Sequence, residues 1–223
     1  MNSLLLQGSI FGIDLPTLIA RLVVLVIAFA FHEFAHAWTA DRFGDMTPRS
    51  QGRLTLNPLV HLDPIGSLML LVAGFGWARP VPINPYALSR RSPAAVMWVS
   101  LAGPLSNFLL AVLGAIAFRL LDLAITSPAS NPALSFFFQF LYYFVQINLL
   151  LLVFNLIPLP PLDGDKILDY FLPPAWSRAL EPIRPYGPMI LLMLIFLAPL
   201  LGRNILFDIL GPPMELLSRL LLG

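Results

Sequence analysis

The most chemically informative stretch of the chain is HEFAH, residues 32–36, which places two histidines four positions apart. Residues four apart share one face of a helix, so both imidazoles can bind a single Zn²⁺ ion. Glu33 follows the first histidine directly, which suits a general base that acts on a water molecule. The pattern therefore predicts a hydrolytic zinc centre on a helix.

The setting of this motif favours a metal site over a chance match. Two of the three histidines in the chain fall within it, and it ends an apolar run long enough to enter a bilayer. Ionisable residues are costly to hold at membrane depth, so they usually mark a functional site. We therefore interpret His32 and His36 as metal ligands and Glu33 as a catalytic residue.

A third ligand must come from elsewhere, because a catalytic zinc ion usually takes three protein ligands and keeps one position open. The chain has no cysteine, which leaves histidine and carboxylate side chains. By residue type, the open candidates are His61, Asp63, Asp163, Asp165 and Asp169. Residue type alone does not choose among them.

The composition indicates what kind of elements must hold this site. The 223 residues are 58% hydrophobic and 11% charged, whereas a soluble domain carries about 25% charged residues. Apolar runs that could span a bilayer lie at about 15–40, 94–121, 134–157 and 188–201. The last residues, 203–223, fit either a short fifth span or an interfacial helix. We expect an all-α polytopic membrane protein that forms one domain over residues 1–223.

One further apolar segment, at about 65–85, is too short and too rich in Gly and Pro to span a bilayer. We expect a re-entrant element there, because irregular backbone is tolerated at membrane depth where protein or water satisfies it. The net charge of +1 and the lack of a basic run argue against a nucleic-acid partner.

The distribution of Lys and Arg predicts the orientation of the chain. Nine of the 13 basic residues lie in the loops after the first and third spans or beside them, and two lie nearest the opposite face. The positive-inside rule puts the two basic loops in the cytoplasm. We therefore expect a multi-pass protein of the cell membrane whose active site faces the cytoplasmic side.

A second motif follows the third span and carries a family resemblance. The site-2 proteases, zinc metalloproteases that cut inside membranes, pair H-E-x-x-H with a later N-x-x-P…L-D-G. The chain resembles them, with Asn155–Pro158 and Leu162–Gly164 at the second motif. The resemblance covers about 16–170 and implies a three-helix catalytic core. It also implies that Asp163 is the third ligand of one zinc ion per chain.

Two shorter matches concern the substrate. AGPLSN, which ends in Asn107, is similar to a G-P-x-x-N element of the family, and AGFGWARP is similar to its re-entrant β-like element. The resemblance implies that the substrate is contacted by Asn107, Asn155, Gly74, Phe75 and Gly76. A simple turn would also explain the glycines, and a hydrogen bond between helices would explain Asn107.

The chain resembles a minimal family member, because no stretch is long enough for a PDZ or CBS module. We expect one or two helices in the C-terminal region, about 187–223. The implied function is a zinc-dependent endopeptidase that cleaves transmembrane segments of other proteins in the lipid bilayer.

Two other functions fit part of the pattern. A zinc-binding membrane protein could transport or sense the metal, but ligand-type residues are sparse on the outer half of every span. A catalytically silent scaffold could keep the fold, but the intact set of His32, Glu33, His36 and Asp163 argues against it.

Overall fold

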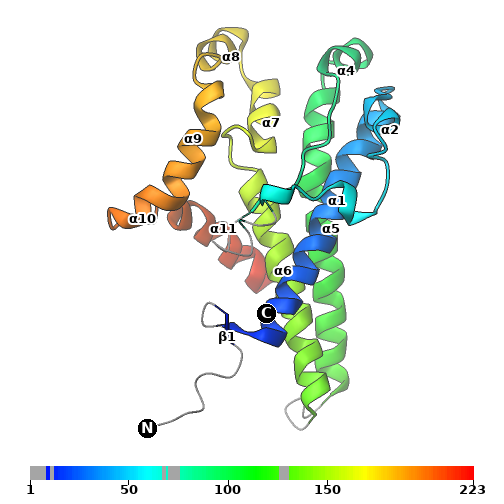
Figure 1. Cartoon of the computed structure of the whole chain (residues 1–223), viewed down its shortest axis with the longest axis vertical. Coiled ribbons are helices and arrows are strands. Elements are labelled where there is room, and N and C mark those ends of the chain that lie inside the picture. Colours follow the sequence, from blue (N-terminus) through cyan, green and yellow to red (C-terminus); the bar gives the residue numbers. More distant parts are fainter. Residues whose placement is uncertain (1–8, 11–12, 67–68, 70–75, 126–130) are drawn as a thin grey trace.

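Three long helices form the centre of the molecule in the computed structural model, which describes residues 9–10, 13–66, 69, 76–125 and 131–223. They are α1 (Leu15–Arg42), α5 (Ala95–Ala124) and α6 (Pro132–Asn155). Helix α5 packs against both α1 and α6 (Figure 1). Each helix is long and apolar enough to cross a membrane, which confirms the predicted all-α polytopic fold.

Local sequence explains where these helices begin and end. The Asp14 carboxylate caps α1 by accepting a hydrogen bond from the backbone N–H of Thr17 at 3.1 Å. The side chain of Asn131 caps α6 in the same way, and Pro132 occupies its first turn. Beyond the end of α1, Gly44 adopts a φ of 87°, a conformation that favours glycine. These signals fix α1 so that HEFAH falls in its last three turns.

The remaining described elements are short. Two antiparallel strands of two residues each, β1 (Ser9–Ile10) and β2 (Ile13–Asp14), precede α1. The others, in chain order, are α2 (Thr47–Ser50), η2 (Pro58–Val60), α4 (Pro85–Arg91), α7 (Asp163–Phe171), α8 (Pro174–Leu180), η4 (Arg184–Tyr186), α9 (Gly187–Leu192), the π-helical η5 (Met193–Leu197), α10 (Ala198–Leu200) and α11 (Ile205–Leu222).

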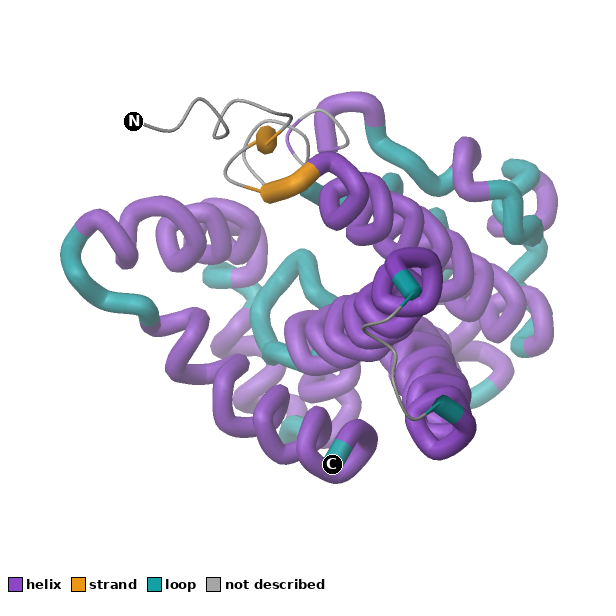
Figure 2. Tube along the Cα trace, turned by 90° about the horizontal axis from the view of Figure 1, so that it is seen from below, coloured by secondary structure: helices purple, strands orange, loops and turns teal. Residues whose placement is uncertain are grey.

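The C-terminal region is helical, as predicted, and it lies to one side of the three long helices (Figures 1 and 2). Helix α8 and the stretch from η4 to α10 meet at a bend of 48°, so the pair forms either one broken span, which would be the fourth, or a re-entrant loop. Helix α11 packs on α6 and α5. The guanidinium of Arg119 on α5 donates to the carbonyl oxygen of Leu221 at 2.6 Å and so anchors the end of α11.

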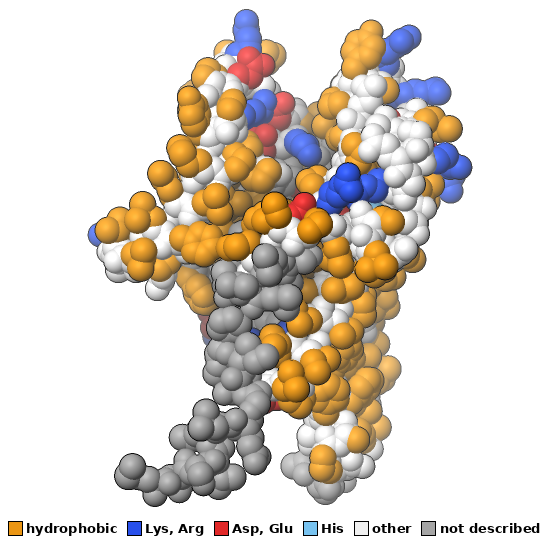
Figure 3. Space-filling model, viewed as in Figure 1, with side chains coloured by type: hydrophobic (Ala, Val, Ile, Leu, Met, Phe, Trp, Pro, Cys, Tyr) orange, Lys and Arg blue, Asp and Glu red, His pale blue; other side chains and the backbone are white. Residues whose placement is uncertain are grey.

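The surface of the long helices suits a bilayer. Leu109, Leu113, Ile116 and Leu120 follow one another along α5, and each is at least half exposed. Such a continuous apolar stripe would be unusual on a soluble monomer. Lys and Arg side chains instead gather towards the end of the molecule that carries α2, α4 and α8 (Figure 3).

The predicted re-entrant β-like element falls partly on residues that the structure does not describe. Its described portion includes an isolated antiparallel bridge between Leu62 and Ala78. The backbone N–H of Arg79 also donates to the carbonyl oxygen of His61 at 2.7 Å. The segment 76–83, called the strap below, is therefore held against the loop that precedes it.

Candidate metal centre

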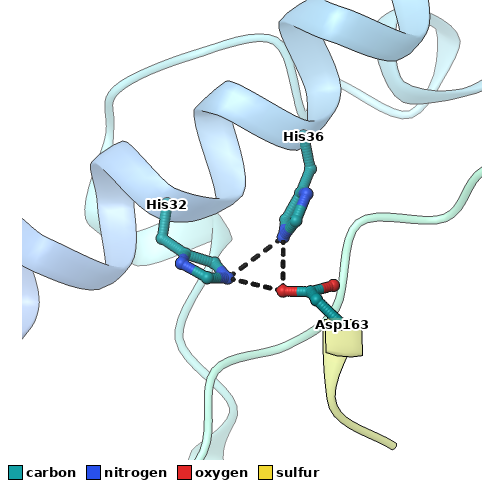
Figure 4. A group of neighbouring side chains, drawn as sticks. All are labelled: His32, His36 and Asp163. Carbon is teal, nitrogen blue, oxygen red and sulfur yellow. Dashed lines mark hydrogen bonds and ion pairs between the residues drawn. The ribbon is translucent and has the colours of Figure 1, made fainter. Parts of the chain in front are cut away.

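Three side chains from two distant parts of the chain converge in the interior (Figure 4). The Oδ2 atom of Asp163 lies 3.2 Å from Nε2 of His32 and 3.2 Å from Nε2 of His36. The two Nε2 atoms are 3.0 Å apart. Ligands at zinc distances of about 2.0–2.1 Å in a tetrahedron would lie roughly 3.3 Å apart. The donor set and its spacing therefore fit a zinc ion.

Close backbone contact brings Asp163 to this point. Asp163 is the first residue of α7, directly after the Pro-rich turn that follows α6. A Cβ atom on Gly164 would lie 2.3 Å from the carbonyl oxygen of Ile157 and 2.4 Å from that of Leu156. Only glycine allows this approach, which explains why the L-D-G motif needs its glycine beside the aspartate.

Two of the other candidate ligands are used elsewhere. His61 is fully buried, and its Nε2–H donates to the carbonyl oxygen of Thr55 at 2.8 Å. The Asp63 carboxylate accepts a hydrogen bond from the backbone N–H of Gly66 at 2.8 Å. Within the part of the chain that the structure describes, His32, His36 and Asp163 form the group that could hold a metal ion.

The last two candidates, Asp165 and Asp169, pair with Arg184. Nε of Arg184 lies 3.2 Å from Oδ1 of Asp165, and its Nη2 forms an ion pair with Asp169. Ser177 also donates to Asp169 at 2.6 Å. Burial acts to raise the pKa of Asp169, but the hydrogen bonds from Ser177 and Arg184 outweigh it and hold that pKa below its ordinary value. These contacts fasten α7, and with it Asp163, to α8 and η4.

The contacts of Asp169 with Ser177 and Arg184 predict a pH-dependent contribution to the stability of the fold. A carboxyl whose pKa is lower in the folded than in the unfolded chain stabilises the fold above its unfolded pKa, and that contribution disappears as the pH falls through the folded value. We expect metal-free wild type to melt about 1–3 °C above Asp169→Asn at a pH of about 7, and the gap to narrow steadily as the pH falls below the ordinary aspartate pKa of about 3.9. A gap that stays constant as the pH is lowered through the acid range would contradict this assignment.

Both histidines are oriented through their second ring nitrogen. Nδ1 of His36 donates to the backbone carbonyl oxygen of Val99 at 2.7 Å. Nδ1 of His32 lies 2.6 Å from Oδ1 of Asn107. Hydrogen bonds of this kind fix the ring and leave the Nε2 lone pair for a metal. Asn107 is fully buried behind His32, which favours a role towards that ring, and its contact with substrate stays a prediction.

His32, His36 and Asp163, called the metal triangle below, line a cavity of about 890 Å³. Glu33 lines the same cavity. Oε2 of Glu33 accepts a hydrogen bond from the backbone N–H of Val81 in the strap at 3.0 Å. Of the predicted substrate residues, Asn155 and Gly76 line the same cavity. Gly74 and Phe75 lie outside the described residues.

Gly103 on α5 is a residue of the site that the sequence motifs did not single out. A Cβ atom there would lie 2.4 Å from Nε2 of His36 and 2.6 Å from Nε2 of His32. At this position α5 must therefore carry no side chain, because the two Nε2 atoms occupy the space. The available signal was its place in AGPLSN, which drew attention only to the asparagine.

We expect Gly103→Ala to lower zinc affinity at least about tenfold, a loss at the lower end of that seen when a supporting contact of a metal ligand is removed. The substitution should not weaken the helix itself, because Ala favours helices over Gly by about 0.5–1 kcal/mol. Competition with a chelator of known affinity measures the change. Gly211→Ala is the matched control, since a Cβ atom there meets nothing within 4 Å; equal affinities in both variants would contradict the prediction.

Comparison with known proteins gives a consistent result. Residues 122–198 match the model of peptidase family M50. The "Putative zinc metalloprotease YwhC" of Bacillus subtilis is 40% identical over 204 residues, which cover 89% of each chain. The "Putative zinc metalloprotease Rip2" of Mycolicibacterium smegmatis is 36% identical over 191 residues, which cover 81% of this chain and 69% of the relative. No solved structure gives a significant match. With a relative this similar over nearly its whole length, the chain belongs to peptidase family M50, the site-2 protease family of zinc metalloproteases.

Proposed function

We propose that the chain is an intramembrane endopeptidase that cleaves transmembrane segments of other membrane proteins. One observation carries the proposal: the three metal-ligand side chains and Glu33 line a single cavity between helices that are apolar enough to lie in a bilayer. Much of the remaining lining is apolar, with residues such as Phe29, Leu150 and Leu206. This environment suits a hydrophobic peptide more than a water-soluble one.

The proposed mechanism assigns a task to each group at the site. His32, His36 and Asp163 would hold zinc, which when bound polarises the scissile carbonyl and activates water for attack. Glu33 acts as general base and later passes the proton to the leaving amine. Its Oε2 already accepts the Val81 N–H, which leaves Oε1 as the oxygen that takes the proton.

The strap is the proposed docking edge for the substrate. A peptide inside a helix is shielded by its own hydrogen bonds, so it must unwind before a nucleophile can reach it. The strap runs beside Glu33 and already forms the bridge at Ala78. We propose that its backbone pairs with an extended substrate, the strand-addition mode of peptide binding. Gly76 and Asn155 would contact the substrate from the cavity wall.

The proposed setting is the cell membrane, with the site towards the cytoplasm. The basic side chains near α2, α4 and α8 support this orientation under the positive-inside rule (Figure 3). The metal triangle lies towards that same end of α1, because His36 is six residues from Arg42 and thus about 9 Å from the helix end.

The test is cleavage of a model transmembrane peptide by the purified chain in proteoliposomes. We expect mass spectrometry to find the cut within the apolar segment. A chelator should abolish the activity, and added zinc should restore it. Zinc-loaded protein that cuts only soluble peptides would contradict the intramembrane proposal, and zinc-loaded protein that cuts neither would favour metal transport or sensing. The described residues contain one grouped metal site and no series of them, which counts against a conduit.

A further inference from the structure

Two buried asparagines connect a metal-ligand histidine to the third long helix. Asn107 on α5 and Asn148 on α6 are both fully buried. Nδ2 of Asn107 donates to Oδ1 of Asn148 at 3.0 Å, while Oδ1 of Asn107 faces Nδ1 of His32 at 2.6 Å. Asn148 does not touch the metal triangle, and none of the motifs discussed above includes it.

The hydrogen bond that Asn148 forms within α6 can run in only one direction. Nδ2 of Asn148 lies 2.8 Å from the backbone carbonyl oxygen of Phe144, which can only accept a hydrogen bond. The amide nitrogen of Asn148 must therefore point at Phe144, and its oxygen must point at Asn107. Since that oxygen only accepts, the amide nitrogen of Asn107 must face it and donate.

A second carbonyl fixes the orientation of Asn107 independently. Its Nδ2 also donates to the backbone carbonyl oxygen of Ala28 on α1 at 3.3 Å. The remaining atom, Oδ1, then faces His32 and accepts a hydrogen bond. His32 must supply the proton from Nδ1, so the lone pair of its neutral ring lies on Nε2, the nitrogen in the metal triangle.

We infer that Asn148 and Asn107 form a relay that sets the tautomer of His32 and so prepares Nε2 to bind zinc. The inference rests on the proposed role of His32 as a zinc ligand, and it makes Asn148 a positioning residue that acts through Asn107. The same amides also join α1, α5 and α6, so a purely structural role must be distinguished from the relay.

The three histidines of the chain give a direct spectroscopic test. In zinc-loaded protein labelled with ¹⁵N-histidine, we expect protected Nδ1–H signals from His32 and His36, and an Nε2–H signal from His61, whose Nε2 donates to Thr55. Asn107→Leu should remove the protection of the His32 proton. Asn148→Leu, which does not touch the His32 ring, should raise the exchange rate of the His32 Nδ1–H proton about tenfold. The His36 signal should stay unchanged, because its Nδ1–H donates to the Val99 carbonyl oxygen.

Zinc affinity supplies the second readout. We expect Asn107→Leu to lower it about 10–100-fold and Asn148→Leu by up to about tenfold, in line with other supporting contacts of metal ligands. In a relay, Asn148→Leu should have no further effect once Asn107 is replaced, whereas independent structural contacts would add. Asn148→Asp should restore both readouts, because a buried, neutral carboxylic acid can accept from Asn107 and donate to Phe144. Gln139→Leu, a polar-to-apolar change at the exposed side of α6, is the control.

The outcomes separate this inference from the proposed function, because neither readout depends on proteolysis. Additive losses of affinity, or a His32 signal that Asn148→Leu leaves unchanged, would overturn the relay and leave the protease proposal intact. A relay that behaves as expected in a chain that cuts no substrate would support the inference and remove the proposed function.

Discussion

Glu33→Gln should lower the rate of peptide cleavage by about 10²–10⁴-fold while the protein keeps its zinc. The range is that for loss of a general acid or base at an active site. The amide of glutamine has nearly the shape of the carboxylate and can still accept the hydrogen bond that Val81 donates to Glu33. It cannot take a proton from water, so the chemical step is lost and the architecture stays. Cleavage rates in proteoliposomes and zinc content by mass spectrometry measure the two effects separately.

Glu215→Gln provides the matched control for this experiment. Glu215 is an exposed acid on α11 that pairs with Arg219, and it does not line the cavity. Its replacement should change neither rate nor zinc content. If Glu33→Gln cleaved as fast as wild type, the general-base assignment would be wrong even with zinc bound.

Asp163→Ala should reduce zinc affinity by more than about 100-fold, because loss of a supporting contact alone costs about 10–100-fold. The variant leaves two imidazoles, which are fewer protein ligands than a catalytic zinc ion usually has. Asp163 is also the only member of the triangle that α1 does not supply. Its loss therefore removes the contact that would tie α7 to α1 through the metal. Zinc content per chain after dialysis, followed by chelator competition, measures the effect.

Asp165→Ala tests whether zinc binding depends on Asp163 in particular or on either acid in the first turn of α7. Asp165 is two residues further along the same helix and pairs with Arg184. We expect this variant to keep its zinc and to lose some thermal stability. Full zinc occupancy in Asp163→Ala, or equal losses in the two variants, would redirect the search for the third ligand.

The sequence predicts the long helices well because local signals determine them. Apolar runs give α1, α5 and α6 to within a few residues, and Asp14 and Asn131 supply recognisable caps. The pairing of His32 with His36 also follows from spacing on one helix. Such features depend on residues close together in the chain.

The rest of the site depends on contacts between distant residues, which one sequence does not reveal. Asp163 meets α1 only because Gly164 allows α7 to approach the end of α6. Composition could not separate Asp163 from Asp165, since both are acids after the same apolar helix. Asn148 gave no signal at all, because an asparagine in an apolar helix shows its role only when its partner on another helix, here Asn107 on α5, is known.

The anchoring of α11 has a practical consequence for anyone who handles this protein. Leu206, Leu210 and Met214 form part of the cavity wall, while the last turn of the helix is held by Arg119. An insertion in the last turn of α11 would lie beside that anchor, and removal of α11 would open the side of the cavity. Purification handles and reporter fusions should therefore keep clear of α11, so that this wall stays in place.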